Sequence, residues 1–145
     1  MTDEPTHLTR RDALRGAAAL CGLSLLALGI TDAQADTDGT QKTRSGQVRV
    51  QLSKYPALKK VGGAAYIGTV GDMPAAVVRT GTSTYAAYSL LCPHAGVTVQ
   101  RSGTGWLCPA HASRFTVTGE FVSGPAGVRL GPIPSRLSGK VLIVG

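Results

Sequence analysis

The sequence predicts an all-β domain over residues 47–145. Three observations predict this fold class: short apolar segments that alternate with polar residues, glycine or proline at most of the boundaries between them, and the lack of any segment with a helical period. Short strands at such intervals are typical of an antiparallel sandwich or small barrel. About 99 residues can bury one modest core, and the sequence contains no internal repeat or second domain.

The expected strands follow one another along the whole region. They lie at residues 48–52, 66–70, 76–78, 85–91, 97–99, 105–107, 115–117, 121–122 and 141–144. Thr118-Gly119 and Ser138-Gly139 each offer a glycine where a tight turn needs a positive φ, so hairpins are expected at both places.

Residues 1–35 have the features of a targeting segment. Arg10 and Arg11 precede an uncharged run, residues 16–30, and Ala33-Gln34-Ala35 has the small-x-small pattern of a cleavage site. The paired arginines resemble a twin-arginine export signal, which implies a location in the periplasm or on the outer face of the cytoplasmic membrane. Fifteen uncharged residues are fewer than the roughly 20 of a spanning helix, so cleavage is expected. The alternative is that this run remains as a membrane anchor.

The chain after residue 35 is strongly basic. It contains twelve Lys and Arg against four Asp and Glu, a formal charge of +8. Such a charge attracts acidic partners at low salt, so we expect an acidic redox protein, a larger oxidoreductase subunit or an anionic membrane surface. The basic residues are scattered and aromatic residues are few, which argues against nucleic acid as a partner. Residues 36–46 are polar without periodicity and are expected to form a linker.

Two short motifs contain every cysteine and histidine of this basic region. Cys92-Pro93-His94 and Cys108-Pro109-Ala110-His111 are separated by thirteen residues, and each follows a strand-like run. Two thiolates and two imidazoles are the mixed ligand set in which sulfur holds one iron of a [2Fe-2S] cluster and nitrogen holds the other. The pattern therefore indicates one such cluster per chain. It predicts electron transfer, with any catalysis belonging to a partner.

These motifs resemble the two ligand boxes of the Rieske family. Cys92–Gly96 resembles the first box, Cys108–Ser113 the second, and Gly124-Pro125-Ala126 the proline-containing loop that covers the cluster. The resemblance spans roughly residues 47–145. It implies a Rieske-type antiparallel β sandwich or barrel with a two-loop cluster-binding subdomain.

The resemblance also implies a role for each ligand. Cys92 and Cys108 would hold the inner iron, while His94 and His111 would hold the outer iron near the surface. Ser113 would donate a hydrogen bond to a cluster sulfur. The chain would then be a freestanding carrier, or the small subunit of an exported oxidoreductase such as those resembling arsenite oxidase or a quinol–cytochrome c complex.

The sequence departs from the family pattern at four positions. Many Rieske proteins join the two loops by a disulfide whose cysteines would fall at Val97 and Ala110, and neither residue can form it. Phe115 stands where relatives of high potential often have a tyrosine that donates to sulfur, so we expect a potential in the middle of the range of roughly −150 to +300 mV. Ala112 replaces a common glycine.

Two other functions use the same residues. A structural zinc site could take the same two cysteines and two histidines, although the C-x-H spacing is tighter than in ordinary zinc motifs. Alternatively, Cys92 could act as a nucleophile with His94 or His111 as its base. Such a base needs a carboxylate to orient it, and none lies near these motifs, since Asp72 and Glu120 are the only acids in residues 47–145.

Overall fold

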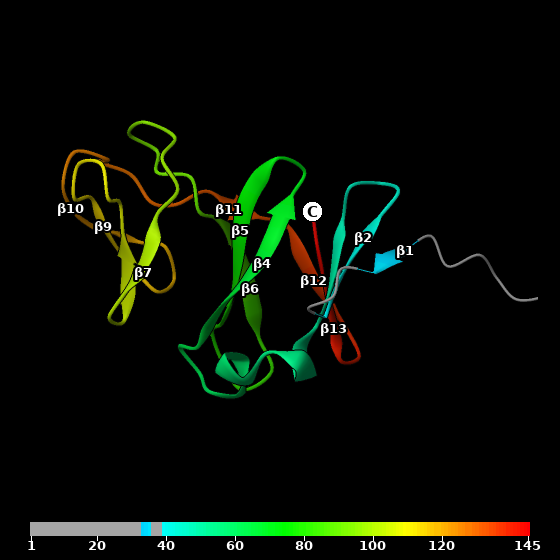
Figure 1. Ribbon diagram of the computed structural model, residues 1–145. Helices are drawn as coiled ribbons and strands as arrows, with labels where there is room; N and C mark the ends of the chain where they lie inside the picture. The colour runs from blue at the N-terminus through cyan, green and yellow to red at the C-terminus, as the bar shows by residue number, and fades with distance from the viewer. Residues whose placement is uncertain (1–32, 36–38) are drawn as a thin grey trace, which may run out of the picture. The chain divides into compact units, whose positions relative to one another are not determined.

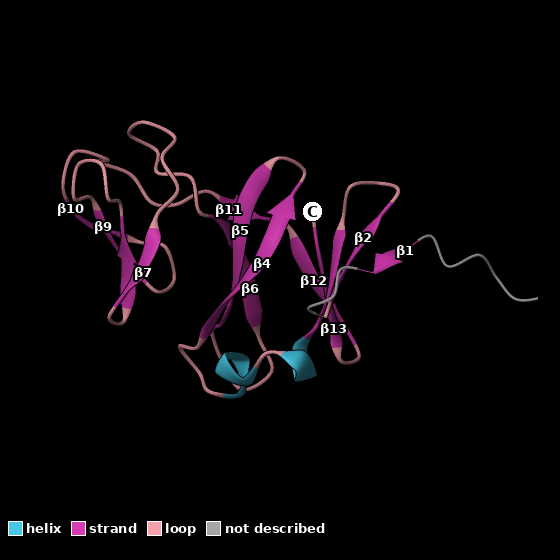
Figure 2. Ribbon diagram, in the orientation of Figure 1, coloured by secondary structure: helices cyan, strands magenta, loops and turns pink. Residues whose placement is uncertain are grey.

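The computed structural model describes residues 33–35 and 39–145, which belong to one unit of the chain (Figure 1). Short strands dominate this region, and two 3₁₀ helices lie together on one side of it (Figure 2). The strands are β1 (Ala33–Ala35), β2 (Thr40–Thr43), β3 (Val48–Gln51), β4 (Ala64–Val70), β5 (Met73–Arg79), β6 (Tyr85–Ser89), β7 (Gln100–Ser102), β8 (Gly105–Leu107), β9 (Arg114–Thr116), β10 (Phe121–Ser123), β11 (Pro132–Ile133), β12 (Ser135–Ser138) and β13 (Val141–Val144). The helices are η2 (Leu52–Lys54) and η3 (Pro56–Lys59).

The strands form three antiparallel sheets. The terminal sheet has the order β1-β2-β3-β13-β12, the central sheet β11-β6-β5-β4, and the ligand sheet β10-β9-β8-β7. In the terminal sheet the last strand pairs with β3, with Val144 opposite Val48. The two ends of the β domain are therefore joined by hydrogen bonds along one strand pair.

Strand β5 supplies side chains to two separate cores. Ala75 and Val77 pack into the core shared with the terminal sheet, whereas Ala76 and Val78 pack into the core shared with the ligand sheet. All four are fully buried. Successive side chains of a strand point to opposite faces, so an uninterrupted apolar run is what a strand covered on both faces requires. The central sheet thus lies between the two cores.

The core on the ligand side contains both cysteines of the motifs. Cys92 and Cys108 are each 1 % exposed and pack among buried aromatic and aliphatic residues. Trp106 of β8 belongs to this core, and its indole N–H donates a hydrogen bond to the Val117 carbonyl oxygen at 3.0 Å. The two ligand loops are therefore anchored by their cysteines in the packed interior.

The structure confirms the all-β prediction and both expected hairpins, which join β9 to β10 and β12 to β13. Other boundaries differ. Residues 40–43, within the expected linker, form β2, which pairs with β3 and buries Thr40. Backbone hydrogen bonds hold this polar strand, so it has no apolar alternation to detect. Leu52 begins η2 instead of extending β3, and β7 starts at Gln100, after the expected strand at 97–99.

Most of the predicted targeting segment lies outside the described residues. The exception is the expected cleavage site, Ala33–Ala35, which forms β1 and pairs with β2 so that Ala35 faces Gln41. Across the residues that the structure describes, no helix has the length and apolar character needed to cross a membrane.

Candidate metal centre

The two ligand loops share one backbone hydrogen-bond pattern. The first loop follows β6; there the Cys92 N–H donates to Val97 O and the Gly96 N–H donates to Cys92 O, both at 2.8 Å. In the second loop, between β8 and β9, the Cys108 N–H donates to Ser113 O at 2.8 Å, and the Ala112 N–H donates to Cys108 O at 3.0 Å. Each loop therefore closes on its own cysteine, and the extra residue before the second histidine does not alter the closure.

Both closures require a left-handed residue four positions after the cysteine. Gly96 has φ 68° and Ala112 has φ 58°. Ala112 is the non-glycine residue with a positive φ in the part of the chain that the structure describes. Such a conformation costs an L-residue on the order of 1–2 kcal/mol. The loop geometry therefore persists at Ala112 in spite of a local backbone cost.

The two thiols lie together in the interior. The Cys92 side chain is hydrogen-bonded to that of Cys108, and both cysteines are free. Burial raises the pKa of the Cys108 thiol, but hydrogen bonds from the backbone of Ala110, from the Cys92 thiol and from the backbone of His111 outweigh it. The pKa is therefore below its ordinary value, which favours the thiolate that a metal requires.

The two imidazoles lie together at the surface. The Nδ1 atoms of His94 and His111 are 3.2 Å apart, their ring centroids are 4.7 Å apart and the rings are nearly perpendicular. Both histidines are exposed. The structure thus brings all four predicted ligands into two pairs, sulfur in the interior and nitrogen at the solvent boundary.

Ser113 connects the second loop to the proline-containing loop. Its side chain is fully buried, and its Oγ accepts a hydrogen bond from the Ala126 N–H at 3.1 Å. A hydroxyl can accept and donate at the same time, so this bond leaves the Ser113 proton free to be donated to another acceptor. A Cβ at Gly124 would lie 2.6 Å from the Ser113 Cα, so glycine is what allows this close approach.

The contact between Ser113 and Ala126 is the feature that the sequence patterns did not predict. The sequence predicts Ser113 only as a donor to sulfur. Nothing in the sequence marks the N–H of Ala126, thirteen residues further on, as the group that donates to the Ser113 hydroxyl. The nearest signal is the Gly-Pro pair at residues 124–125, which indicates a turn but does not say what the turn packs against.

Two departures noted in the sequence have clear places in the structure. Phe115 is 2 % exposed and lies in the same core as both cysteines, where a tyrosine hydroxyl would enter the interior beside them. Val97 packs against that core and Ala110 is exposed, so side-chain packing and the two closures described above hold the loops.

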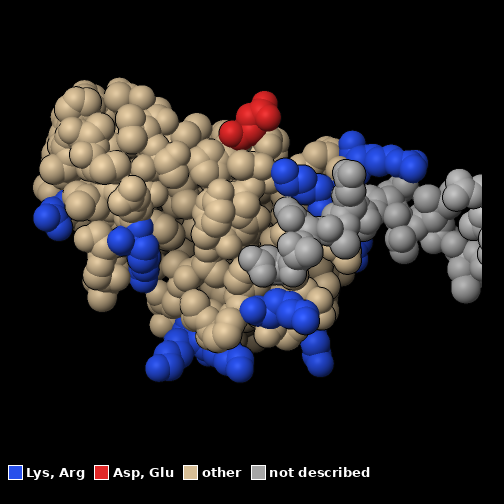
Figure 3. Space-filling view, in the orientation of Figure 1, with Lys and Arg blue, Asp and Glu red and all other residues tan. Residues whose placement is uncertain are grey.

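The surface around the imidazoles is uncharged. The three loops at residues 92–97, 108–113 and 124–127 contain no Lys, Arg, Asp or Glu. In Figure 3 the upper left of the molecule, where these loops lie, shows no charged group on the visible face. A partner that approaches the histidines would therefore not have to desolvate a charge of this chain.

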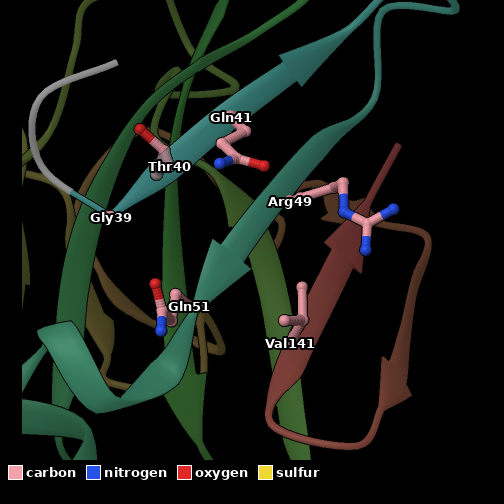
Figure 4. Close-up of a pocket in the computed structure, with 6 residues that line it drawn as sticks. All are labelled: Gly39, Thr40, Gln41, Arg49, Gln51 and Val141. Carbon is pink, nitrogen blue, oxygen red and sulfur yellow. The ribbon is translucent and has the colours of Figure 1, made fainter. Parts of the chain in front are cut away.

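The described residues also form hollows away from the ligand loops. One has a volume of about 100 Å³ on the terminal sheet and is lined by Gly39, Thr40, Gln41, Arg49, Gln51 and Val141 (Figure 4). It contains neither cysteine nor histidine. The metal chemistry of the described residues is therefore concentrated at the two ligand loops.

Comparison with known proteins identifies the family of the region that contains these loops. The family model described as "Rieske [2Fe-2S] domain" matches residues 51–134. Over 80 residues the chain is 36 % identical to the cytochrome b6-f complex iron-sulfur subunit of Trichodesmium erythraeum (strain IMS101), covering 52 % of this chain and 44 % of the relative. The corresponding subunit of Chlorobaculum thiosulfatiphilum is 32 % identical over 60 residues, covering 40 % of this chain and 33 % of that subunit. The chain thus spans less than half the length of these two relatives.

Solved structures show the same fold. The plasma membrane Rieske protein PetC3 from Synechocystis PCC 6803 aligns with a TM-score of 0.51 and 29 % identity, covering 62 % of this chain and 93 % of that one. The quaternary ammonium Rieske monooxygenase CntA aligns with a TM-score of 0.51 at 16 % identity, covering 61 % of this chain and 29 % of the oxygenase. At that identity the second alignment supports the fold alone.

Proposed function

Because this chain belongs to the Rieske [2Fe-2S] domain family, we propose that Cys92, Cys108, His94 and His111 hold its cluster. The chain then passes single electrons between redox partners. The observation that carries the proposal is the separation of the four ligands into a buried thiol pair and an exposed imidazole pair. When bound, the cluster supplies reversible one-electron transfer at a potential that its ligands and hydrogen bonds set.

The residues around the ligands each have a defined task. The core holds the two cysteines away from water, and the closures at Gly96 and Ala112 aim both loops at one place. Ser113 offers its hydroxyl proton from a fully buried position. The uncharged loops leave the histidine edge open to a partner. Electrons therefore enter and leave at the imidazoles, the part of the site that meets the surface.

The alternative is a structural zinc ion held by the same four residues. A tetrahedral ion needs its four ligands around one point, at about 2.0–2.3 Å. The separation of sulfur from nitrogen, and the buried Ser113 hydroxyl beside the second loop, favour two metal atoms with sulfide between them. The two assignments differ in composition, because one requires iron and acid-labile sulfide and the other requires neither.

The test is metal and sulfide analysis of the purified chain with single-ligand variants. We expect two irons and two sulfides per chain, and a reduced protein whose paramagnetic resonance shows nitrogen couplings from two imidazoles. Cys92→Ser and His111→Ala should abolish the cluster. Cys21→Ser and His7→Ala, made in the uncleaved chain, are matched controls that change the remaining cysteine and histidine, and they should retain it. One zinc and no sulfide would establish the alternative.

The proposal extends to where the protein acts. The paired arginines support export by the twin-arginine route to the periplasm or the outer face of the cytoplasmic membrane, because thiolates are loaded with iron before they meet an oxidising compartment. Arg10→Lys with Arg11→Lys should leave the holoprotein in the cytoplasm. Export of the variant with its cluster would contradict this route.

The relatives support a role within a larger assembly. Two of them are named as subunits of a cytochrome b6-f complex, which favours for this chain an electron-transfer subunit or dedicated carrier of a larger oxidoreductase. Gel filtration of a native extract tests this role. We expect the cluster to elute with a larger redox protein, whereas elution of the chain alone would indicate a freestanding carrier.

A further inference from the structure

A second functional surface lies away from the ligand loops. Four exposed lysines gather where η2, η3 and the β12–β13 turn lie, and we define them as the lysine face: Lys54, Lys59, Lys60 and Lys140. Figure 3 shows basic groups along the lower side of the molecule, where Figure 1 places η2 and η3. From these charges and the residues among them, we infer that the lysine face docks on an anionic lipid bilayer.

Contacts of Arg79 tie the parts of this face together. Its guanidinium donates to the backbone oxygens of Lys59 and Thr82, and it lies 5.8 Å from the centre of the Tyr85 ring. Arg79 is partly buried and donates four hydrogen bonds to backbone oxygens, so it acts as a structural tie and is not counted among the charges of the face. The helix η3 is thereby held next to the β5–β6 turn.

A hollow of about 250 Å³ lies within the same face. Its lining includes Leu52, Ser53, Thr82, Ser83, Leu137 and Lys140. Hydroxyl groups next to an ammonium group and two leucines are suited to the phosphate of a lipid head group, with the adjoining glycerol region against the leucines.

Acidic groups lie elsewhere in the described region. Its Asp and Glu residues are Asp72 and Glu120. Glu120 pairs with Arg129 at 3.3 Å in the ligand sheet. Asp72 lies in the β4–β5 turn; η3 adjoins the other end of β4, and seven strand residues span about 23 Å. Figure 3 shows an acidic group on the side opposite the lower basic groups. Among the described residues, therefore, no acidic group lies beside the lysine face.

Exposed apolar side chains accompany these lysines. Val61, directly after Lys60, is 60 % exposed, and Leu137, at the rim of the hollow, is 44 % exposed. Lysine with interspersed apolar residues is the composition of surfaces that rest in the head-group region of a membrane. Protein interfaces instead favour arginine and are depleted in lysine. The composition therefore favours a lipid surface over an acidic protein.

The position of the face relative to the ligand loops has a functional consequence. Strand β6 begins at Tyr85, beside the Thr82–Ser83 end of the hollow, and the chain reaches Cys92 only after the strand has ended. Docking through the lysine face would therefore leave the ligand loops directed away from the bilayer, where a soluble partner can reach the histidines.

The test uses the full chain and two kinds of vesicle, phosphatidylcholine alone and phosphatidylcholine with about one third phosphatidylglycerol. Any contribution of residues 16–30 is common to every variant, so the measured quantity is the difference in partitioning between the two vesicles. Each lysine near an anionic surface contributes about fivefold. Replacing the four lysines of the face by Gln should lower the difference at least about tenfold. A matched control replaces four other basic residues by Gln and should keep it: Lys42, Arg49, Arg114 and Arg136.

Two further measurements separate lipid from other anions. Val61→Gln with Leu137→Gln keeps every charge and should weaken binding to the anionic vesicles severalfold. The matched change at Val122 and Val128, exposed valines of the ligand subdomain, should have no effect. Ser53→Ala with Ser83→Ala should also weaken binding to the anionic vesicles, because both hydroxyls line the hollow.

The inference is overturned if the control variant loses as much binding as the face variant. It is also overturned if poly-L-glutamate or inorganic phosphate binds the face while anionic vesicles do not, which would make it a site for acidic protein or free anion. All of these measurements can be made whatever metal the chain holds, so failure here leaves the proposed electron transfer untouched.

Discussion

Gly96 and Ala112 hold the same left-handed backbone conformation, each donating its N–H to the carbonyl oxygen of the cysteine four residues before it. Only one of the two is the residue that this conformation favours. The loops therefore offer a matched pair of substitutions whose effects on the free energy of unfolding should have opposite signs.

Ala112→Gly should stabilise the protein by about 0.5–1 kcal/mol, because the relief of left-handed strain exceeds the added freedom of the unfolded chain. Gly96→Ala should destabilise it by about 1 kcal/mol, and purely through the backbone, since no atom lies within 4 Å of the added Cβ. Denaturant unfolding of both variants measures the effect. If both substitutions changed the stability in the same direction, the two loops would not be equivalent.

Gly124→Ala should destabilise the protein by about 3 kcal/mol and lower its iron content. The new Cβ would lie 2.6 Å from the Ser113 Cα, and φ 100° is strained for alanine. Gly127→Ala is the control, because its φ is also positive at 70° but nothing lies within 4 Å. Thermal unfolding and iron analysis compare them. A control as damaging as Gly124→Ala would show that backbone strain alone is responsible.

Ser113→Ala should lower the reduction potential by on the order of 50–100 mV. A hydrogen bond to a cluster sulfur stabilises the reduced, more negative state, and a charge-assisted bond contributes about 1.5–3 kcal/mol at most. The change also leaves the partly buried Ala126 N–H without its acceptor, so stability should fall as well. Protein-film voltammetry measures the potential, with Ser123→Ala in the exposed strand β10 as control. An unchanged potential would mean that the Ser113 proton points elsewhere.

Phe115→Tyr should raise the potential by about 40 mV, the equivalent of roughly 1 kcal/mol for one electron. Phe115 is buried in the core that contains both cysteines, so a hydroxyl there can reach sulfur. Phe121, whose ring lies 6.4 Å from that of Phe115, is partly exposed and provides the control substitution. If both tyrosine variants shift the potential equally, a general change of polarity is the cause.

Arg79→Lys should destabilise the protein by about 2–3 kcal/mol while leaving the potential unchanged. A lysine cannot reproduce the planar fork that donates to backbone oxygens within the β5–β6 turn and at η3. Arg136→Lys on the exposed strand β12 is the matched control. Denaturant unfolding and voltammetry on the same samples separate the two effects. A shifted potential would show that the β5–β6 turn is coupled to the ligand loops.

The sequence by itself determined the chemistry and the fold class. Cysteine and histidine are scarce after residue 35, so two short motifs were enough to single out the four candidate ligands, and the apolar residues 76–78 were enough to predict a strand. These features are local, because a ligand motif and a strand period each depend on residues close together in the chain.

Tertiary structure alone decided what depends on contacts between distant segments. Strand β2 is polar and exists through backbone pairing with β3, and Ser113 meets Ala126 only because the Gly124 turn folds back over the second loop. The lysine face likewise joins η2 and η3 to the turn at Lys140 across more than half of the chain. A sequence pattern does not show which distant surfaces will pack, because packing depends on the shapes of both partners once they are folded.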